Sequence, residues 1–77
     1  MKTVEVSLNS IDKVKSFVNT IAKFDFDFDL VSGRYVIDAK SIMGIFSLDL
    51  SKPITLNIHA NEADLAAILD VLAPYLV

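Results

Sequence analysis

A serine hydroxyl at the start of a short helical segment is the first group in this sequence whose position suggests chemistry. Ser41 follows the residues of a predicted strand and precedes an apolar run, which is the position of a helix N-cap. A phosphate on this hydroxyl would meet the free N–H groups and the positive end of the dipole of the first helical turn. The position therefore indicates a phosphorylation switch at Ser41, with simple helix capping as the alternative.

The residues that follow Ser41 include an apolar cluster. Phe46 comes three residues after Met43 and four after Ile42, so the three side chains lie close together on a helical turn. Exposed apolar clusters often mark interfaces with other proteins, whereas the same spacing also suits side chains that pack into a core. Both readings of Ile42, Met43 and Phe46 stay open at this point.

Three carboxylates alternate with aromatic residues in the segment Phe24–Leu30. If this segment is a strand, Asp25, Asp27 and Asp29 share one face of a sheet. A hard-cation site or an acid/base pair could be built from such a row, but nothing nearby supplies the turn and carbonyl ligands of calcium sites. We interpret the row as a solvated face, and we expect no metal and no cofactor.

His59 is the only histidine of the chain. It alternates with Ile58 at the end of an apolar-polar repeat, so we expect a structural histidine that faces solvent. No partner base, metal-ligand cluster, glycine-rich phosphate loop or nucleophile elbow accompanies it in the sequence. We therefore expect no catalytic residue, and a protein that is not an enzyme.

Seven elements must position these groups. Alternation predicts strands, and three-to-four spacing predicts helices. We expect Asn61 to cap the last helix and Pro74 to end or bend it. The order β-α-β-β-α-β-α, with helices covering one face of a four-stranded sheet, makes an α+β open-faced sandwich. The predicted strands are Thr3–Leu8, Phe24–Leu30 (at least from Phe26 onward), Tyr35–Ile37 and Ile54–His59, and the predicted helices are Ser10–Lys23, a short turn after Ser41, and a final helix through Leu65, Ile68, Leu69, Leu72 and Leu76.

Composition narrows the classes of function. Seventy-seven residues suit one domain, residues 1–77, and the absence of cysteine excludes disulfides and thiolate metal sites. The net charge is −3 and the basic residues are scattered, which argues against nucleic-acid binding. No apolar run approaches the ~18 residues of a membrane span, and the N-terminus lacks the apolar core of a signal peptide. We expect a soluble, cytoplasmic protein that binds neither nucleic acid nor membrane.

The segment Lys40-Ser41-Ile42-Met43-Gly44, followed by Ser47-Leu48, resembles the regulatory-serine segment of HPr, the small phosphocarrier of the bacterial sugar phosphotransferase system. The resemblance extends from Val4 to about Leu72. It implies an antiparallel sheet with three helices packed on one side. It also implies that an ATP-dependent HPr kinase phosphorylates Ser41, and that Ile42, Met43 and Phe46 form a partner-binding patch.

The resemblance also locates a degenerate phosphohistidine site. HPr proteins carry phosphate on a histidine at the start of the first helix, followed two residues later by an arginine. On the register of the serine segment, which needs no gap, these positions hold Ser10 and Asp12. A serine hydroxyl without an adjacent base is a weak nucleophile, and Asp12 would repel a phosphate. Lys40, beside Ser41, could screen a phosphate there.

These observations lead to three hypotheses about function. The first is an HPr-like regulatory or interaction protein, without phosphohistidine carrier activity, that is phosphorylated on Ser41 and linked to carbon catabolite repression through a transcriptional regulator. The second is a phosphocarrier of the sugar transport system that uses another residue. The third is an unmodified decoy that binds Enzyme I or HPr kinase. Asp12 replaces the arginine that the regulator would be expected to use, which keeps the third hypothesis open.

Overall fold

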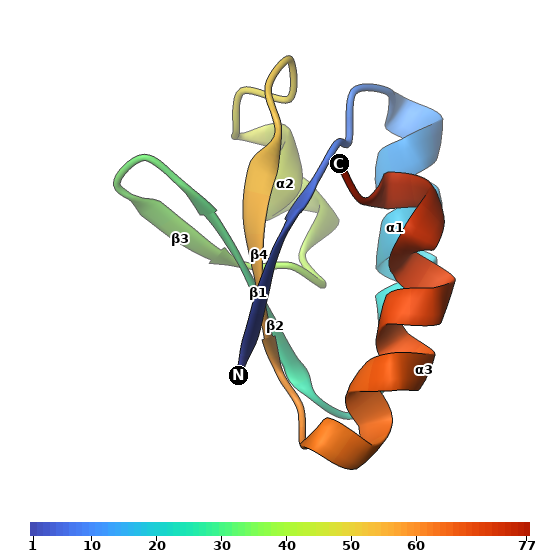
Figure 1. The fold of residues 1–77 in the computed structure, drawn as a ribbon. Helices are drawn as coiled ribbons and strands as arrows, with labels where there is room; N and C mark the ends of the chain where they lie inside the picture. Colours follow the sequence, from blue (N-terminus) through green and yellow to red (C-terminus); the bar gives the residue numbers. More distant parts are fainter.

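The chain folds into four strands and three helices in the order β-α-β-β-α-β-α, followed by one 3-10 helix. This description rests on a computed structural model that covers residues 1–77. Figure 1 shows the elements: β1 (Lys2–Val6), α1 (Ile11–Ile21), β2 (Asp27–Ser32), β3 (Tyr35–Asp38), α2 (Ile42–Phe46), β4 (Ile54–His59), α3 (Glu62–Leu72) and η1 (Ala73–Tyr75).

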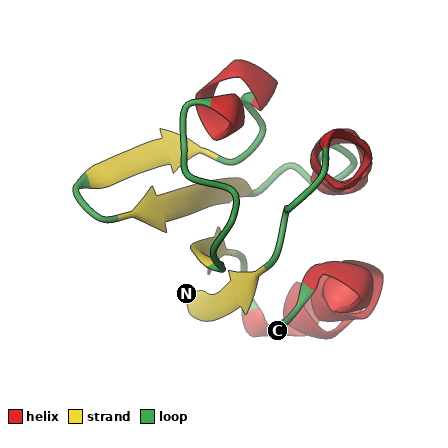
Figure 2. Ribbon diagram, turned by 90° about the horizontal axis from the view of Figure 1, so that it is seen from above, coloured by secondary structure: helices red, strands yellow, loops and turns green.

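The strands form one antiparallel sheet in the order β1-β4-β2-β3. All three helices lie on the same side of this sheet, and the other side is open (Figure 2). A two-residue turn joins β2 to β3, and Gly33 takes the positive φ of 60° that its first position requires. The predicted fold class, an α+β open-faced sandwich, is confirmed.

Strand alternation separates the two faces of the sheet. Successive side chains of a strand point to opposite faces, so each strand contributes every second residue to the core. On the central strands the inward residues are completely or almost completely buried: Phe28, Leu30, Leu56 and Ile58. Most outward residues of the same strands are polar, among them Asp27, Asp29, Asn57 and His59.

The core joins the first helix to the C-terminal end of the chain. Phe17 of α1 is fully buried and meets the ring of Tyr75 edge-on, with 5.6 Å between ring centroids and 80° between ring planes. The Tyr75 hydroxyl forms a hydrogen bond with the Ser16 hydroxyl, so its one polar atom is satisfied. No charged or polar side chain is buried, and burial of apolar surface therefore supplies the main stabilisation.

All three helices begin at a residue whose side chain caps them. Ser10 accepts a hydrogen bond from the N–H of Lys13, and Asn61 accepts one from the N–H of Asp64, each at 3.1 Å. Ser41 does the same for α2. These bonds satisfy N–H groups that have no acceptor inside the helix. The capping role predicted for Asn61 is confirmed.

The observed bounds of β2 and β1 differ from the predicted ones. β2 begins at Asp27, so Asp25 lies outside the strand and does not share the face of Asp27. The preceding Phe24 and Phe26 are half-buried and pack against the core, which explains why the aromatic alternation starts before the strand does. β1 ends at Val6, although the predicted strand ran to Leu8, which is still buried.

The helix termini follow local chemistry. α3 ends at Leu72 and the chain continues as η1, in which Pro74 occupies an N-terminal position. Of the two predicted effects of Pro74, ending or bending the helix, the structure shows the first, and Leu76, which was predicted to belong to this helix, lies beyond it. In the loop after α2, Asp49 accepts hydrogen bonds from the hydroxyl and the N–H of Ser51, at 2.6 and 3.1 Å. These bonds to the ionised form lower the pKa of the Asp49 carboxyl below its ordinary value.

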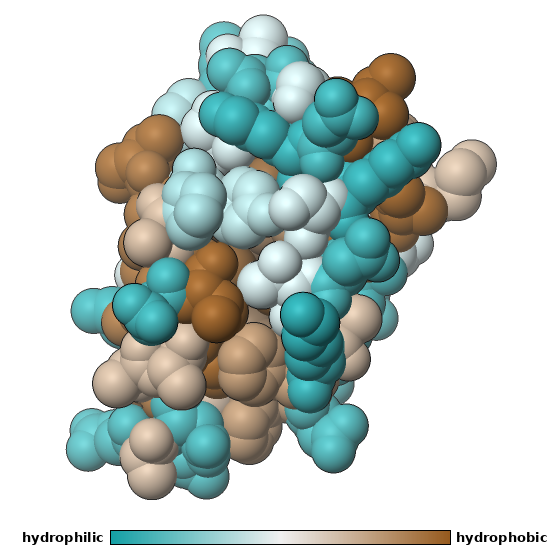
Figure 3. Space-filling view, turned by 90° about the vertical axis from the view of Figure 1, so that its right-hand side faces the viewer, coloured by the Kyte–Doolittle hydropathy of each residue, from teal (hydrophilic) through white to brown (hydrophobic).

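The helix side of the molecule presents a mixed surface. Hydrophilic side chains (teal) and apolar side chains (brown) are mixed over this face, and neither kind covers it (Figure 3). No helix has the length and apolar character that a membrane crossing needs.

The packing of α1 gives the first testable prediction. Phe17→Ala removes a fully buried ring and should lower the free energy of unfolding by ~3–5 kcal/mol. Ile11→Ala, on the same helix, truncates a side chain that is 62% exposed and should change it by less than ~0.5 kcal/mol. Urea unfolding followed by circular dichroism measures both. Equal losses in the two variants would contradict the assignment of the core.

Candidate functional site

Ser41 lies at the junction of β3 and α2, with its hydroxyl on the surface. Its Oγ accepts a hydrogen bond from the N–H of Gly44 at 3.2 Å, and its carbonyl accepts one from the N–H of Ile45 at 3.0 Å. Its own N–H donates to the carbonyl of Asp38 at 3.0 Å. Ser41 is an exposed residue. The backbone of the cap is therefore held from both sides, while the hydroxyl remains accessible to a macromolecular partner.

Gly44 allows the cap to close tightly. A Cβ atom at this position would lie 3.2 Å from Ser41 Oγ and 3.3 Å from Ile37 Cδ1, closer than almost all real Cβ contacts. Any larger residue would push either the serine hydroxyl or the β3 side chain aside. The sequence pairing of Ser41 with Gly44 thus has a steric reason.

The structure separates the members of the apolar cluster after Ser41. Met43 is 78% exposed and Phe46 is 41% exposed, so neither is a core residue. Ile42 is half-buried and packs against the core, and Ile45, which was not singled out from the sequence, is fully buried. The five-residue helix is anchored through Ile45 and presents Met43 and Phe46 to solvent.

The side chain of Lys40 makes its contacts away from Ser41, contrary to the role suggested by the sequence. Its ammonium donates a hydrogen bond to the carbonyl of Phe24 at 2.7 Å and lies 5.7 Å from the centroid of the Phe28 ring. The expected screening of a phosphate on Ser41 is therefore not seen in this arrangement. Instead, Lys40 fastens the segment that leads into β2 to the end of β3.

Ser10 and Asp12 lie together at the start of α1. Ser10 is the N-cap and Asp12 is in the first turn, and both side chains are exposed. α1 packs against α2, so the two helices of interest are neighbours. The first turn of α1 presents a hydroxyl and a carboxylate, and it presents neither an imidazole nor a guanidinium.

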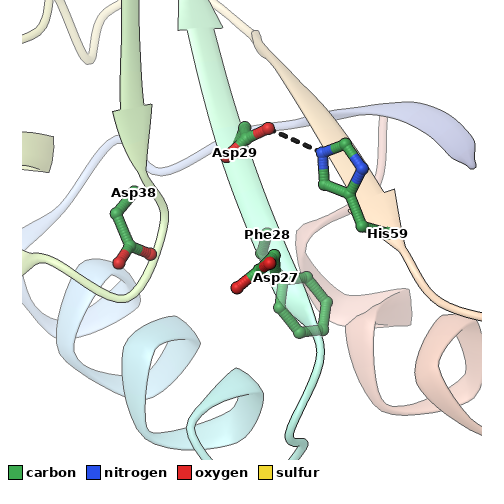
Figure 4. A pocket seen from close by; sticks show the side chains of 5 residues that line it. All are labelled: Asp27, Phe28, Asp29, Asp38 and His59. Carbon is green, nitrogen blue, oxygen red and sulfur yellow. Dashed lines mark hydrogen bonds and ion pairs between the residues drawn. The ribbon is translucent and has the colours of Figure 1, made fainter.

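His59 lies on the open face of the sheet and has a partner that the sequence analysis missed. Its Nε2 is 2.6 Å from Asp29 Oδ2, and the two side chains are 40% and 35% exposed (Figure 4). The expectation that His59 faces solvent is correct. The pair could have been found only from the antiparallel pairing of β2 with β4, which brings Asp29 and His59 onto the same face of neighbouring strands.

The hydrogen-bonded side chains of Asp29 and His59 border a shallow depression of about 420 Å³ on the open face. Its walls are Asp27, Phe28, Asp29, Asp38 and His59, drawn in Figure 4, and no lysine or arginine is among them. Three carboxylates lie around one imidazole here, and their negative charge disfavours an incoming phosphate. The side chains also do not converge into a set of three metal ligands.

Comparison with known proteins adds independent findings. Residues 12–76 match the family described as "PTS HPr component phosphorylation site", and the match begins two residues after Ser10. A solved structure titled HPr-C-His, from Thermoanaerobacter tengcongensis, has 26% sequence identity and a TM-score of 0.77, covering 96% of this chain and 89% of that one. The phosphocarrier protein HPr from Bacillus anthracis has 30% identity and a TM-score of 0.70, covering 99% and 94%. The histidine-containing phosphocarrier protein of Mycoplasma, at 18% identity and a TM-score of 0.68, covering 95% and 91%, shares the fold.

The orientation of α2 gives the second prediction. Ile45→Ala, which truncates the buried anchor of the helix, should lower the free energy of unfolding by ~2–5 kcal/mol. Met43→Ala, two residues away on the exposed side, should change it by less than ~0.5 kcal/mol. Chemical unfolding of the two variants in parallel measures the difference. A larger loss for Met43→Ala than for Ile45→Ala would show that the helix faces the other way.

Proposed function

The chain belongs to the HPr family of the phosphotransferase system, and from that premise we propose that it acts as a regulatory protein modified on Ser41 instead of as a phosphohistidine carrier. The observation that carries the proposal is the exposed Ser41 hydroxyl at the N-cap of α2, in a chain whose first helix begins without a histidine. The exposed Met43 and Phe46 on the same helix supply an adjoining apolar surface for a partner.

The reaction at Ser41 is a phosphoryl transfer from ATP, supplied by an HPr-type kinase. A new bond forms between Ser41 Oγ and the γ-phosphorus as the bond from that phosphorus to the bridging oxygen of ADP breaks. The hydroxyl proton passes to a base of the kinase. The product carries about −1.5 to −2 charges, next to backbone N–H groups of the first turn of α2 that lack acceptors inside the helix.

Two features favour regulation over phosphate carriage. Ser10 has no adjacent base to activate its hydroxyl, and the neighbouring Asp12 repels phosphate. His59, the only histidine, is engaged with Asp29 in a depression lined by carboxylates. Neither Ser10 nor His59 is therefore a suitable nucleophile for a phosphocarrier.

A decoy that docks on Enzyme I or on HPr kinase without being modified is the second candidate. Asp12 is the observation that favours it, because this carboxylate is exposed in the first turn of α1, and α1 packs against α2. A phosphate on Ser41 would gain no counter-charge from this helix start. A transcriptional regulator whose binding site pairs with an arginine at the position of Asp12 would bind the phosphorylated chain weakly.

Phosphorylation of Ser41 is the third prediction. Incubation with ATP and an HPr-type kinase should add one phosphate, stable to acid, that intact-mass spectrometry detects and fragmentation assigns to Ser41. Ser41→Ala should abolish it. Ser47→Ala is the matched control, since it removes the hydroxyl at the other end of the same helix, where Ser47 Oγ donates to the carbonyl of Gly44 at 2.6 Å. The absence of phosphate on every residue would favour the decoy, and phosphate on Ser47 instead of Ser41 would contradict the assignment of the modified residue.

The degenerate site at the start of α1 gives the fourth prediction. The natural chain should accept no phosphate from Enzyme I and phosphoenolpyruvate. Ser10→His with Asp12→Arg should create an acceptor, because the imidazole then lies at a helix start beside a cation that attracts the phosphate. Ser10→His alone is the matched control and should accept less. An acid-labile adduct on the natural chain that disappears in His59→Ala would overturn the proposal.

A further inference from the structure

β3 is the unprotected edge of the sheet. The opposite edge, β1, is covered at one end by the C-terminal segment, where Leu76 forms a bridge with Val6 and the N–H of Val77 donates to the carbonyl of Glu5 at 3.1 Å. No strand or tail pairs with the outer side of β3. Figure 1 shows the β2–β3 hairpin projecting away from the helices. An edge of this kind presents unpaired N–H and C=O groups that can pair with another strand.

The residues of β3 do little to prevent such pairing. Tyr35 and Val36 are 70% and 65% exposed, and both types are favoured in strands. The strand contains no proline, no lysine and no bulge, which are the usual means of protecting an edge. The only charges are at its two ends, Arg34 in the turn before it and Asp38 at its last residue.

The direction of the backbone groups follows from the hairpin. Ser32 and Tyr35 flank the two-residue turn, so the N–H and C=O groups of Tyr35 face β2. The N–H of Ala39 donates to the carbonyl of Phe28 at 2.8 Å, which continues the same alternation along the strand. Val36 lies between Tyr35 and Ile37, whose N–H and C=O groups face β2, so the N–H and C=O groups of Val36 point outward and are available to a partner.

We propose that β3 pairs antiparallel with β3 of a second copy of this chain, about a two-fold axis at Val36, extending the sheet from four strands to eight. In this register Val36 faces its own copy and exchanges both backbone hydrogen bonds with it. Arg34 of each copy lies opposite Asp38 of the other, and Tyr35 lies opposite Ile37. A two-fold interface is self-complementary in this way because each contact occurs twice.

Charge selects this register over its neighbours. A shift by one residue would place side chains that belong to the open face against side chains that belong to the helix face. A shift by two residues in either direction puts Val36 opposite Arg34 or Asp38, and both opposite-charge pairs are lost. Opposite charges directly across a strand pair stabilise it, and like charges destabilise it. In this antiparallel register the charges of β3 and its turn are complementary to those of a second copy, and we therefore identify a second copy of this chain as the partner.

Sedimentation velocity on the whole chain tests the proposal. The interface is small, so the dimer should be weak and the measurement should extend to about 1 mM. Arg34→Glu sets a carboxylate opposite Asp38 at both ends of the strand pair, and Asp38→Lys sets an ammonium opposite Arg34 at both ends. Each variant alone should raise the dimer Kd by at least about tenfold, since two attractive pairs become two repulsive ones. An equal mixture of the two variants should recover dimers, because the mixed dimer has opposite charges at both ends.

Two controls are needed: one shows whether the β3 edge, and not β1, forms the dimer, and the other shows whether each variant is folded. Lys2→Glu changes the net charge as Arg34→Glu does but lies on β1, and it should leave the Kd unchanged. Asp38 also accepts a hydrogen bond from the N–H of Lys40 at 2.9 Å, so circular dichroism must show that Asp38→Lys is folded. If it is not, Val36→Lys, which sets two ammonium groups at the axis, should by itself give a monomer. A natural chain that is monomeric at about 1 mM, dimers lost in Lys2→Glu, or an equal mixture that stays monomeric would each overturn the proposal.

Discussion

Burial of Ile45 is the contact on which the geometry of the Ser41 site depends. A helix of five residues is far too short to be stable on its own, because nucleation is costly and few hydrogen bonds follow it. α2 exists because Ile45 is fully buried among core side chains while the Ser41 cap closes its first turn. Once this side chain is fixed, helical spacing leaves Met43 and Phe46 on the solvent side.

The distribution of carboxylates divides the surface of the molecule into regions that disfavour a phosphate group and one region that does not. The open face of the sheet carries Asp27, Asp29 and Asp38 around one histidine, and this concentration of carboxylates opposes any phosphate. The first turn of α1 carries Asp12, which opposes phosphate there too. The N-cap of α2 has no carboxylate as a hydrogen-bond partner of its serine side chain, and its first turn contains no acidic residue. The proposal that Ser41 is the modified residue rests on this contrast.

Sequence periodicity was sufficient for the architecture because strand alternation and helix capping are local properties. Ser41 and Asn61 could be placed as caps from their neighbours alone, and the alternation of β4 fixed which of its residues are buried. The start of β2 was predicted too early. Phe24 and Phe26 alternate with polar residues as strand residues do, but they lie in the loop before β2 and pack against the core from there. The Asp29–His59 pair and the contact of Lys40 with the Phe24 carbonyl join distant positions, and sequence spacing carries no information on either.

The central claim is that phosphate reaches this chain through a kinase at Ser41 and not through a phosphohistidine. One measurement tests it most directly: intact-mass spectrometry of the natural chain after parallel incubation with HPr-type kinase plus ATP and with Enzyme I plus phosphoenolpyruvate. We predict one acid-stable phosphate in the first sample and none in the second. An acid-labile phosphate in the second sample, with none in the first, would contradict the account.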